Sequence, residues 1–200
     1  MKCRVRTQKP NISKNRIIEN IKEVVNANGY CVEIGDIIVS LYTYMVSHNL
    51  FGGCHALSSV LYVALREMGF NPILLIGECQ LQGQKPFDHS WLSMDNKIID
   101  LAIFMPLTQI VNSVSGPVVF DEDVITLRKT NLQYGINTHL PLSADTNNVI
   151  NLPFCDYMDY FPNETEGLWT VLKNIMPPSY VFNLYDLKEK YKTTTRQFVR

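Results

Sequence analysis

An uncharged stretch of 29 residues, from 37 to 65, constrains the fold of this chain more than any other feature of its sequence. Such a stretch must first be tested as a membrane span, which needs about 20 predominantly apolar residues. Polar residues between 40 and 49 interrupt it, and the pair Gly52-Gly53 divides it into two shorter segments. The sequence therefore predicts two core helices and no membrane span.

Helical periodicity covers most of the first 69 residues. Apolar residues recur every three or four positions in 17–25, after Ser13 as a helix cap, and again in 34–45. A third helix begins at Cys54, and Gly69 occupies the position after its end that glycine favours. Apolar residues lie on most sides of this third helix, so we expect it to be buried.

The pattern changes from helix to strand after Gly69. Strands are predicted at 73–79, 88–94 and 97–103. The pair Asp95-Asn96 suits a two-residue hairpin turn between the last two strands, because both residues tolerate positive φ. The first half therefore reads as helices packed against a small antiparallel sheet.

The second half of the chain is less regular. Residues 118–127 predict one or two strands, and helices are expected near 155–161, 167–176 and 180–192. The fold class is α+β, with a core in residues 1–104. Residues 105–200 are interpreted as a C-terminal subdomain of the same domain, which forms either a wall or lid of a cleft or a small core of its own.

Charge and cysteine content exclude several classes of protein. A net charge of −1 lacks the basic field of nucleic-acid binders, and the basic ends at 1–22 and 188–200 are interpreted as solvated faces. The five cysteines are scattered without a CxxC pair, which favours free thiols in a reducing compartment. The start of the sequence lacks the apolar stretch of a signal peptide, so a cytoplasmic location is expected.

Cys54 is the candidate nucleophile. It begins a helix directly after two glycines, where unsatisfied N–H groups and the helix dipole favour the thiolate. Glycine at 53 leaves space for a substrate to approach, so Gly53 is a candidate for the cleft wall. The alternative interpretation is that Cys54 is an ordinary buried thiol on an apolar helix.

His89 and Asp100 are the candidate partners of that thiol. If the turn has two residues, the numbers of residues that face each other across the hairpin sum to 191, so Trp91 faces Asp100. His89 lies two residues from Trp91 on the same strand, so the side chains of His89, Trp91 and Asp100 share one face of the sheet. His89 and Asp100 become diagonal neighbours on adjacent strands, with roughly 7 to 8 Å between their backbones, within reach of an imidazole and a carboxylate. A three-residue turn would place Asp100 on the opposite face.

Three segments resemble one known family. GGCHALSSVLYVALREMGFNP, then ILLIGE, then DHSWLSMDNKIIDLA are similar to the transglutaminase-like cysteine enzymes of the papain-like superfamily, including the bacterial branch of the lasso-peptide maturation peptidases. The resemblance covers about residues 50 to 104. It implies a papain-like core, with Cys54 as nucleophile, His89 as base and then acid, and Asp100 as the group that orients the imidazole.

The implied reaction is acyl transfer or hydrolysis on a peptide or isopeptide amide, through a thioester on Cys54 and without a cofactor or metal. Water or an amine is the acceptor, and the oligomeric state is left open. An oxyanion would be held by the Cys54 N–H and a side chain upstream, with Asn49 as the candidate; the alternative for Asn49 is a helix cap. Trp91, two residues after the histidine, is a candidate for the substrate cleft.

Three other interpretations remain. An arylamine N-acetyltransferase uses the same three residue types with acetyl-CoA, but its usual glycine-pair motif places one more residue before the cysteine. A non-catalytic peptide-binding module with a papain-like cleft would be expected to lose one of the three residues. A structural zinc site of Cys54, His89 and Asp100 has suitable ligand types but lacks motif spacing.

Overall fold

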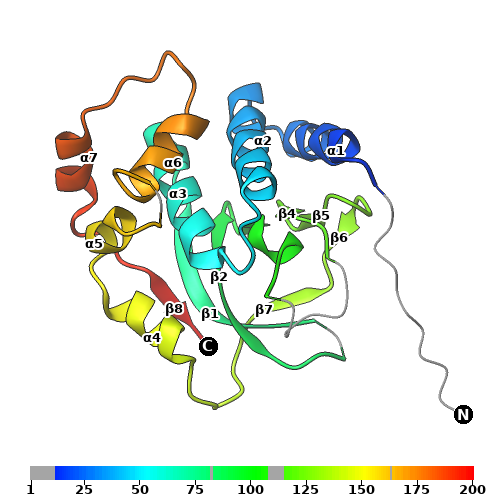
Figure 1. Cartoon of the computed structure of the whole chain (residues 1–200). Helices are drawn as coiled ribbons and strands as arrows, with labels where there is room; N and C mark the ends of the chain where they lie inside the picture. Colours follow the sequence, from blue (N-terminus) through cyan, green and yellow to red (C-terminus); the bar gives the residue numbers. More distant parts are fainter. Residues whose placement is uncertain (1–11, 82, 108–114, 163) are drawn as a thin grey trace, which may run out of the picture.

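The protein is described by a computed structural model that covers residues 12–81, 83–107, 115–162 and 164–200. Cys3 and the first part of the basic N-terminal segment lie outside these residues. The fold is α+β, with three N-terminal helices and a curled antiparallel sheet (Figure 1). The elements of the first half are α1 (Lys14–Ala27), α2 (Val32–Ser47), α3 (Cys54–Glu67), β1 (Ile73–Leu81), β2 (Phe87–Met94), β3 (Lys97–Asp100) and the 3-10 turn η1 (Ala102–Phe104).

The three predicted N-terminal helices are confirmed, and their ends follow from local sequence. The Ser13 side chain accepts a hydrogen bond from the Arg16 N–H and caps α1. Helix α3 ends at Glu67 with Met68 as its C-cap, and Gly69 follows with a φ of +86°, a conformation that L side chains rarely adopt. Ten residues of α3 are buried, which explains why the uncharged window extends through it.

The hairpin of β2 and β3 has the predicted two-residue turn. Asp95 and Asn96 have φ of 51° and 62°. Leu92 pairs with Ile99, which is the register expected for a two-residue turn, because the two residue numbers sum to 191. The third predicted strand was too long, since β3 stops at Asp100 and the chain turns into η1. The Asp100 carboxylate accepts the Ile103 N–H at 3.2 Å, and this local bond favours the turn over a continued strand.

The second half of the chain extends the same sheet on both sides. The strand order is β6-β5-β4-β3-β2-β1-β7, and β8 lies parallel to β1 beside Leu75 to Gly77. The elements are β4 (Val118–Val119), β5 (Glu122–Asp123), β6 (Arg128–Lys129), β7 (Leu132–Ile136), α4 (Ala144–Asn151), α5 (Phe154–Asp159), α6 (Leu168–Ile175), α7 (Leu184–Tyr191) and β8 (Gln197–Val199). Strands β6, β7 and β8 and helix α4 were not predicted.

Helices cover one face of the sheet, and α3 lies among them. It contacts β1 and β2 below and α2, α5 and α6 around it (Figure 1). The main core includes Val60 of α3, Leu92 of β2 and Trp169 of α6, so both halves of the chain contribute to it. A second, smaller hydrophobic cluster includes Cys79 and Trp91. It is formed by side chains on the opposite face of the strands.

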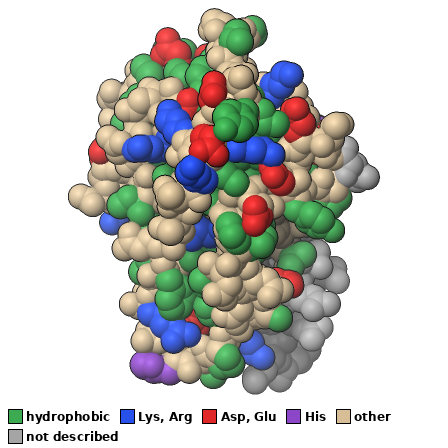
Figure 2. Space-filling model, turned by 90° about the vertical axis from the view of Figure 1, so that its left-hand side faces the viewer, with side chains coloured by type: hydrophobic (Ala, Val, Ile, Leu, Met, Phe, Trp, Pro, Cys, Tyr) green, Lys and Arg blue, Asp and Glu red, His purple; other side chains and the backbone are tan. Residues whose placement is uncertain are grey.

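The basic C-terminal segment carries its charge on an exposed surface. Figure 2 shows a face on which acidic and basic side chains are intermingled. Lys188, Lys190 and Lys192 form ion pairs with Asp159, Glu67 and Glu189, and these lysine side chains are 37% to 60% exposed. Within the described residues, no helix combines the length and apolar character needed to cross a membrane.

Candidate active site

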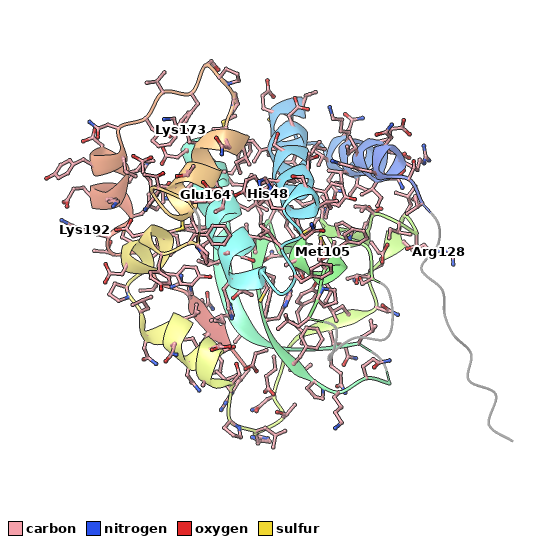
Figure 3. All side chains as sticks on the ribbon, in the orientation of Figure 1. His48, Met105, Arg128, Glu164, Lys173 and Lys192 are labelled. Carbon is pink, nitrogen blue, oxygen red and sulfur yellow. The ribbon has the colours of Figure 1, made fainter. Side chains whose placement is uncertain are left out.

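Cys54 is the first residue of α3, and the loop that leads to it is tightly held. The Gly52 N–H donates to the Met105 carbonyl at 2.8 Å. Figure 3 labels Met105, just after η1, and His48, at the end of α2. Gly53 is the N-cap of α3 and offers no side chain to the helix N-terminus, so the first-turn N–H groups near Cys54 have no side-chain cap.

Two imidazoles control the charge of the Cys54 thiol. The residue is 8% exposed, and burial by itself raises the pKa of a thiol. The nearby rings of His89 and His55 outweigh burial and lower the pKa of Cys54 to about 5. Cys54 is therefore a thiolate at neutral pH, which is the nucleophilic form of cysteine.

His89 and Asp100 form a buried ion pair. The His89 Nε2 lies 2.7 Å from the Asp100 Oδ2, and the two residues are 5% and 1% exposed. Burial alone would lower the pKa of His89, but the Asp100 carboxylate, and then the Cys54 thiolate, raise it to about 10. Since Nε2 is engaged with Asp100, Nδ1 is the nitrogen left for Cys54. The predicted proximity of His89 and Asp100 is confirmed.

Asp100 has two further hydrogen-bond donors. The Tyr134 hydroxyl of β7 donates to Oδ2 at 2.9 Å, and the Ile103 N–H donates to Oδ1. Burial and the adjacent carboxylate raise the pKa of Tyr134 well above its ordinary value, so this phenol remains a donor. Sequence reasoning missed Tyr134, because it belongs to a strand that was not predicted and that reaches the site from across β1.

His55 lies on the other side of Cys54. Its Nδ1 is 2.6 Å from the Ser90 Oγ, and Ser90 is the residue after His89 on β2. Successive strand side chains point to opposite faces, so His89 and Ser90 act on opposite sides of β2. Adjacent residues on a helix do not face each other, so the sequence gives no reason to expect His55 at the Cys54 sulfur. The structure nevertheless brings its ring close to the thiolate.

Two pockets meet at Cys54. The larger, of about 850 Å³, is lined by Cys54 and His55 and also by Asp88, Ser143 and Asp145. The smaller, of about 50 Å³, is lined by Cys54, His89 and apolar side chains that include Leu107. The 105–200 half therefore supplies part of the wall of both pockets.

The structure places the remaining site candidates in different surroundings. Asn49 is exposed with a φ of 53° just after the end of α2, and it lines neither pocket. Trp91 is 1% exposed, packs on Tyr134 at 5.1 Å between ring centroids, and lines neither pocket. Gly53 also lines neither.

Gly52, rather than Gly53, is the glycine that the pockets require. It lines both of them and has a φ of +68°. A Cβ at this position would lie 2.5 Å from the Leu107 side chain, whereas a Cβ at Gly53 would make only ordinary contacts. The glycine pair is thus a turn residue followed by a cap residue.

The comparisons with known proteins find no match for this chain. No protein-family model, curated protein or solved structure matches the chain. Among the described residues, no group of three or more His, Cys, Asp or Glu side chains is placed to hold a metal ion. What the site can do is therefore argued from its own residues.

Proposed function

We propose that this protein is a transglutaminase-like cysteine enzyme with a papain-like core, which cleaves or transfers the acyl group of a peptide or isopeptide amide. The observation that carries the proposal is the chain of contacts from the Cys54 thiolate through His89 to Asp100, with 2.7 Å between the last two side chains. A thiolate, an imidazolium and a buried carboxylate in this order are the groups that covalent acyl transfer needs.

The reaction follows from these roles. The Cys54 sulfur attacks the carbonyl carbon, and the carbonyl electron pair moves to oxygen. His89 then gives its proton to the leaving nitrogen as the carbon–nitrogen bond breaks, which leaves a thioester on Cys54. Water or an amine, deprotonated by His89, attacks the thioester and releases the thiolate. The Asp100 carboxylate keeps the imidazole in place throughout.

The pockets and the other cysteines agree with this proposal. A pocket of about 850 Å³ falls within the usual range for ligand sites of several hundred to a thousand Å³, so it has room for a segment of peptide. Cys31, Cys54, Cys79 and Cys155 are all free thiols. We place the reaction in a reducing compartment, the cytoplasm, where such a thiolate persists.

Selective alkylation tests the nucleophile. At pH 6 and equimolar iodoacetamide, we expect mass spectrometry to find label on Cys54 before Cys31, although Cys31 is exposed and Cys54 is 8% exposed. If exposure alone governed reactivity, Cys31 would react first. Labelling of Cys31 ahead of Cys54 would contradict the proposal.

Trapping of the acyl-enzyme tests the reaction. The chain is incubated with cell extract and Cys54 is searched for a hydroxylamine-sensitive adduct, with Cys54→Ser as the control. The adduct mass identifies the acyl group, and a peptidyl adduct is the expected result. An acetyl adduct formed with acetyl-CoA alone would instead support an arylamine N-acetyltransferase. If no adduct forms with extract or with reactive esters, the protein is not an acyl-transfer enzyme.

A further inference from the structure

One polar group in the larger pocket helps to stabilise the Cys54 thiolate but takes part in no later step of the reaction described so far. His55 lines that pocket next to Cys54, is partly exposed, and is held by the buried hydroxyl of Ser90 at 2.6 Å. The thiolate already has a base in His89, whose other nitrogen is engaged with Asp100. A second ring that contacts the same sulfur is not needed for proton transfer to the leaving group.

The oxyanion, in contrast, has no side-chain donor assigned to it in that reaction. A negative charge that develops on the carbonyl oxygen needs two fixed donors, and the N–H of Cys54 at the start of α3 supplies one. Asn49 was expected to supply the other, but it is exposed at the end of α2 and lines neither pocket that Cys54 lines. His55 shares a pocket with Cys54, and its hydrogen bond to Ser90 holds it to strand β2.

We propose that His55 is the side-chain donor of the oxyanion hole, an inference that rests on the proposed acyl transfer at Cys54. Because Nδ1 is engaged with the Ser90 hydroxyl at 2.6 Å, Nε2 is the ring nitrogen left to donate a hydrogen bond. When the Cys54 sulfur bonds to the carbonyl carbon and the electron pair moves to oxygen, that oxygen accepts hydrogen bonds from the His55 Nε2–H and the Cys54 N–H. Collapse of the intermediate returns the electron pair to the carbonyl as the leaving group departs with the proton from His89.

Two reagents for the same sulfur separate this role from a structural one. Acylation by p-nitrophenyl acetate builds an oxyanion, whereas alkylation by iodoacetamide does not. The ratio of the two rates, both measured at pH 8 on the full chain, cancels any change in the fraction of thiolate. Loss of one oxyanion donor slows acylation by about 100-fold or more. We expect His55→Ala to lower the ratio by that factor, with iodoacetamide alkylation changed by less than about threefold.

Conservative and matched variants sharpen the test. His55→Gln keeps an N–H donor and should recover part of the ratio, and His48→Gln, at an exposed histidine outside both pockets, should leave it unchanged. An unchanged ratio in His55→Ala would overturn the inference, as would a large loss in Asn49→Gly, which removes that side chain while tolerating positive φ. If the wild-type chain alkylates but does not acylate, the proposed function itself fails.

Discussion

The two histidines beside Cys54 are held by opposite kinds of contact. His89 lies on β2, backed by the carboxylate of Asp100, and is 5% exposed. His55 lies on the first turn of a helix, backed by the neutral hydroxyl of Ser90, and borders a wide pocket. Charge and burial fix the first ring, and a neutral hydrogen bond between a helix and a strand positions the second. We therefore expect substitutions among the contacts of His89 to reduce stability more than substitutions among the contacts of His55.

The largest effect is expected from the carboxylate. Asp100→Asn removes the negative partner of a buried ion pair, which leaves His89 without a counter-charge. Loss of one member of such a pair costs about 3 kcal/mol of unfolding free energy. Urea denaturation measures it, with Asp156→Asn as an exposed control that should change stability by less than about 0.5 kcal/mol. Equal losses in the two variants would show that burial of this pair does not matter.

The next effect tests the support from across the sheet. Tyr134→Phe deletes the hydroxyl that donates to Asp100 at 2.9 Å, and a hydrogen bond to a charged group contributes about 2 kcal/mol. The expected result is a lower urea midpoint with an unchanged slope. Tyr160→Phe is the control, because Tyr160 is 83% exposed. A wild-type urea midpoint in Tyr134→Phe would show that the Tyr134 hydroxyl does not stabilise Asp100.

A smaller effect is expected on the reactivity of Cys54. Because its pKa is lowered from the ordinary 9.0 to about 5, the rate of alkylation should rise between about pH 4 and 6 and then stay level. His89→Ala removes the imidazolium that stabilises the thiolate, so the midpoint should move toward 9. The gain in intrinsic nucleophilicity offsets part of the loss of thiolate, and we expect alkylation at pH 6 to slow by about tenfold. A midpoint that stays near 5 in His89→Ala would assign control of the thiolate to His55 instead.

The smallest effect concerns the contact between α3 and β2 on the His55 side. The Ser58 hydroxyl donates to the Ser90 carbonyl at 2.9 Å, and both residues are buried. A neutral hydrogen bond of this kind contributes about 1 kcal/mol, so Ser58→Ala should lower stability by that amount. Ser59→Ala is the control, since its hydroxyl bonds only within its own helix, to the His55 carbonyl. If Ser58→Ala lowers the unfolding free energy as much as Asp100→Asn does, the contacts around His55 and those around His89 contribute equally to stability, contrary to our expectation.

The sequence predicts local structure and the face of each side chain, and these parts of the site followed from it. The alternation of side chains across a two-residue turn places His89 beside Asp100, because both residues lie close to that turn on adjacent strands. The dihedral angles of Asp95 and Asn96 confirm the turn itself. The helix that begins at Cys54 is equally local, since glycines mark its start and its end.

Contacts between distant segments were not predictable in this way. Tyr134 reaches Asp100 from a strand of only five residues, LQYGI, which contains a glycine, a residue that is depleted in strands. The tether between His55 and Ser90 depends on how closely α3 approaches β2, which periodicity does not determine. Asn49 is the candidate by its position five residues before Cys54, but nearness along the chain does not bring it to the wall of either pocket.

The parallel pairing of β8 with β1 sets the order of events during synthesis. Gln197 pairs with Leu75, 122 positions earlier in the sequence. At roughly 5 to 20 residues per second, the ribosome needs about 6 to 25 s to produce that span. The edge of β1 therefore remains unpaired at Leu75 to Gly77 for seconds in the growing chain, and an open strand edge attracts other strands. Slow translation of the second half would lengthen this exposure, so codon choice there is expected to affect how much protein folds.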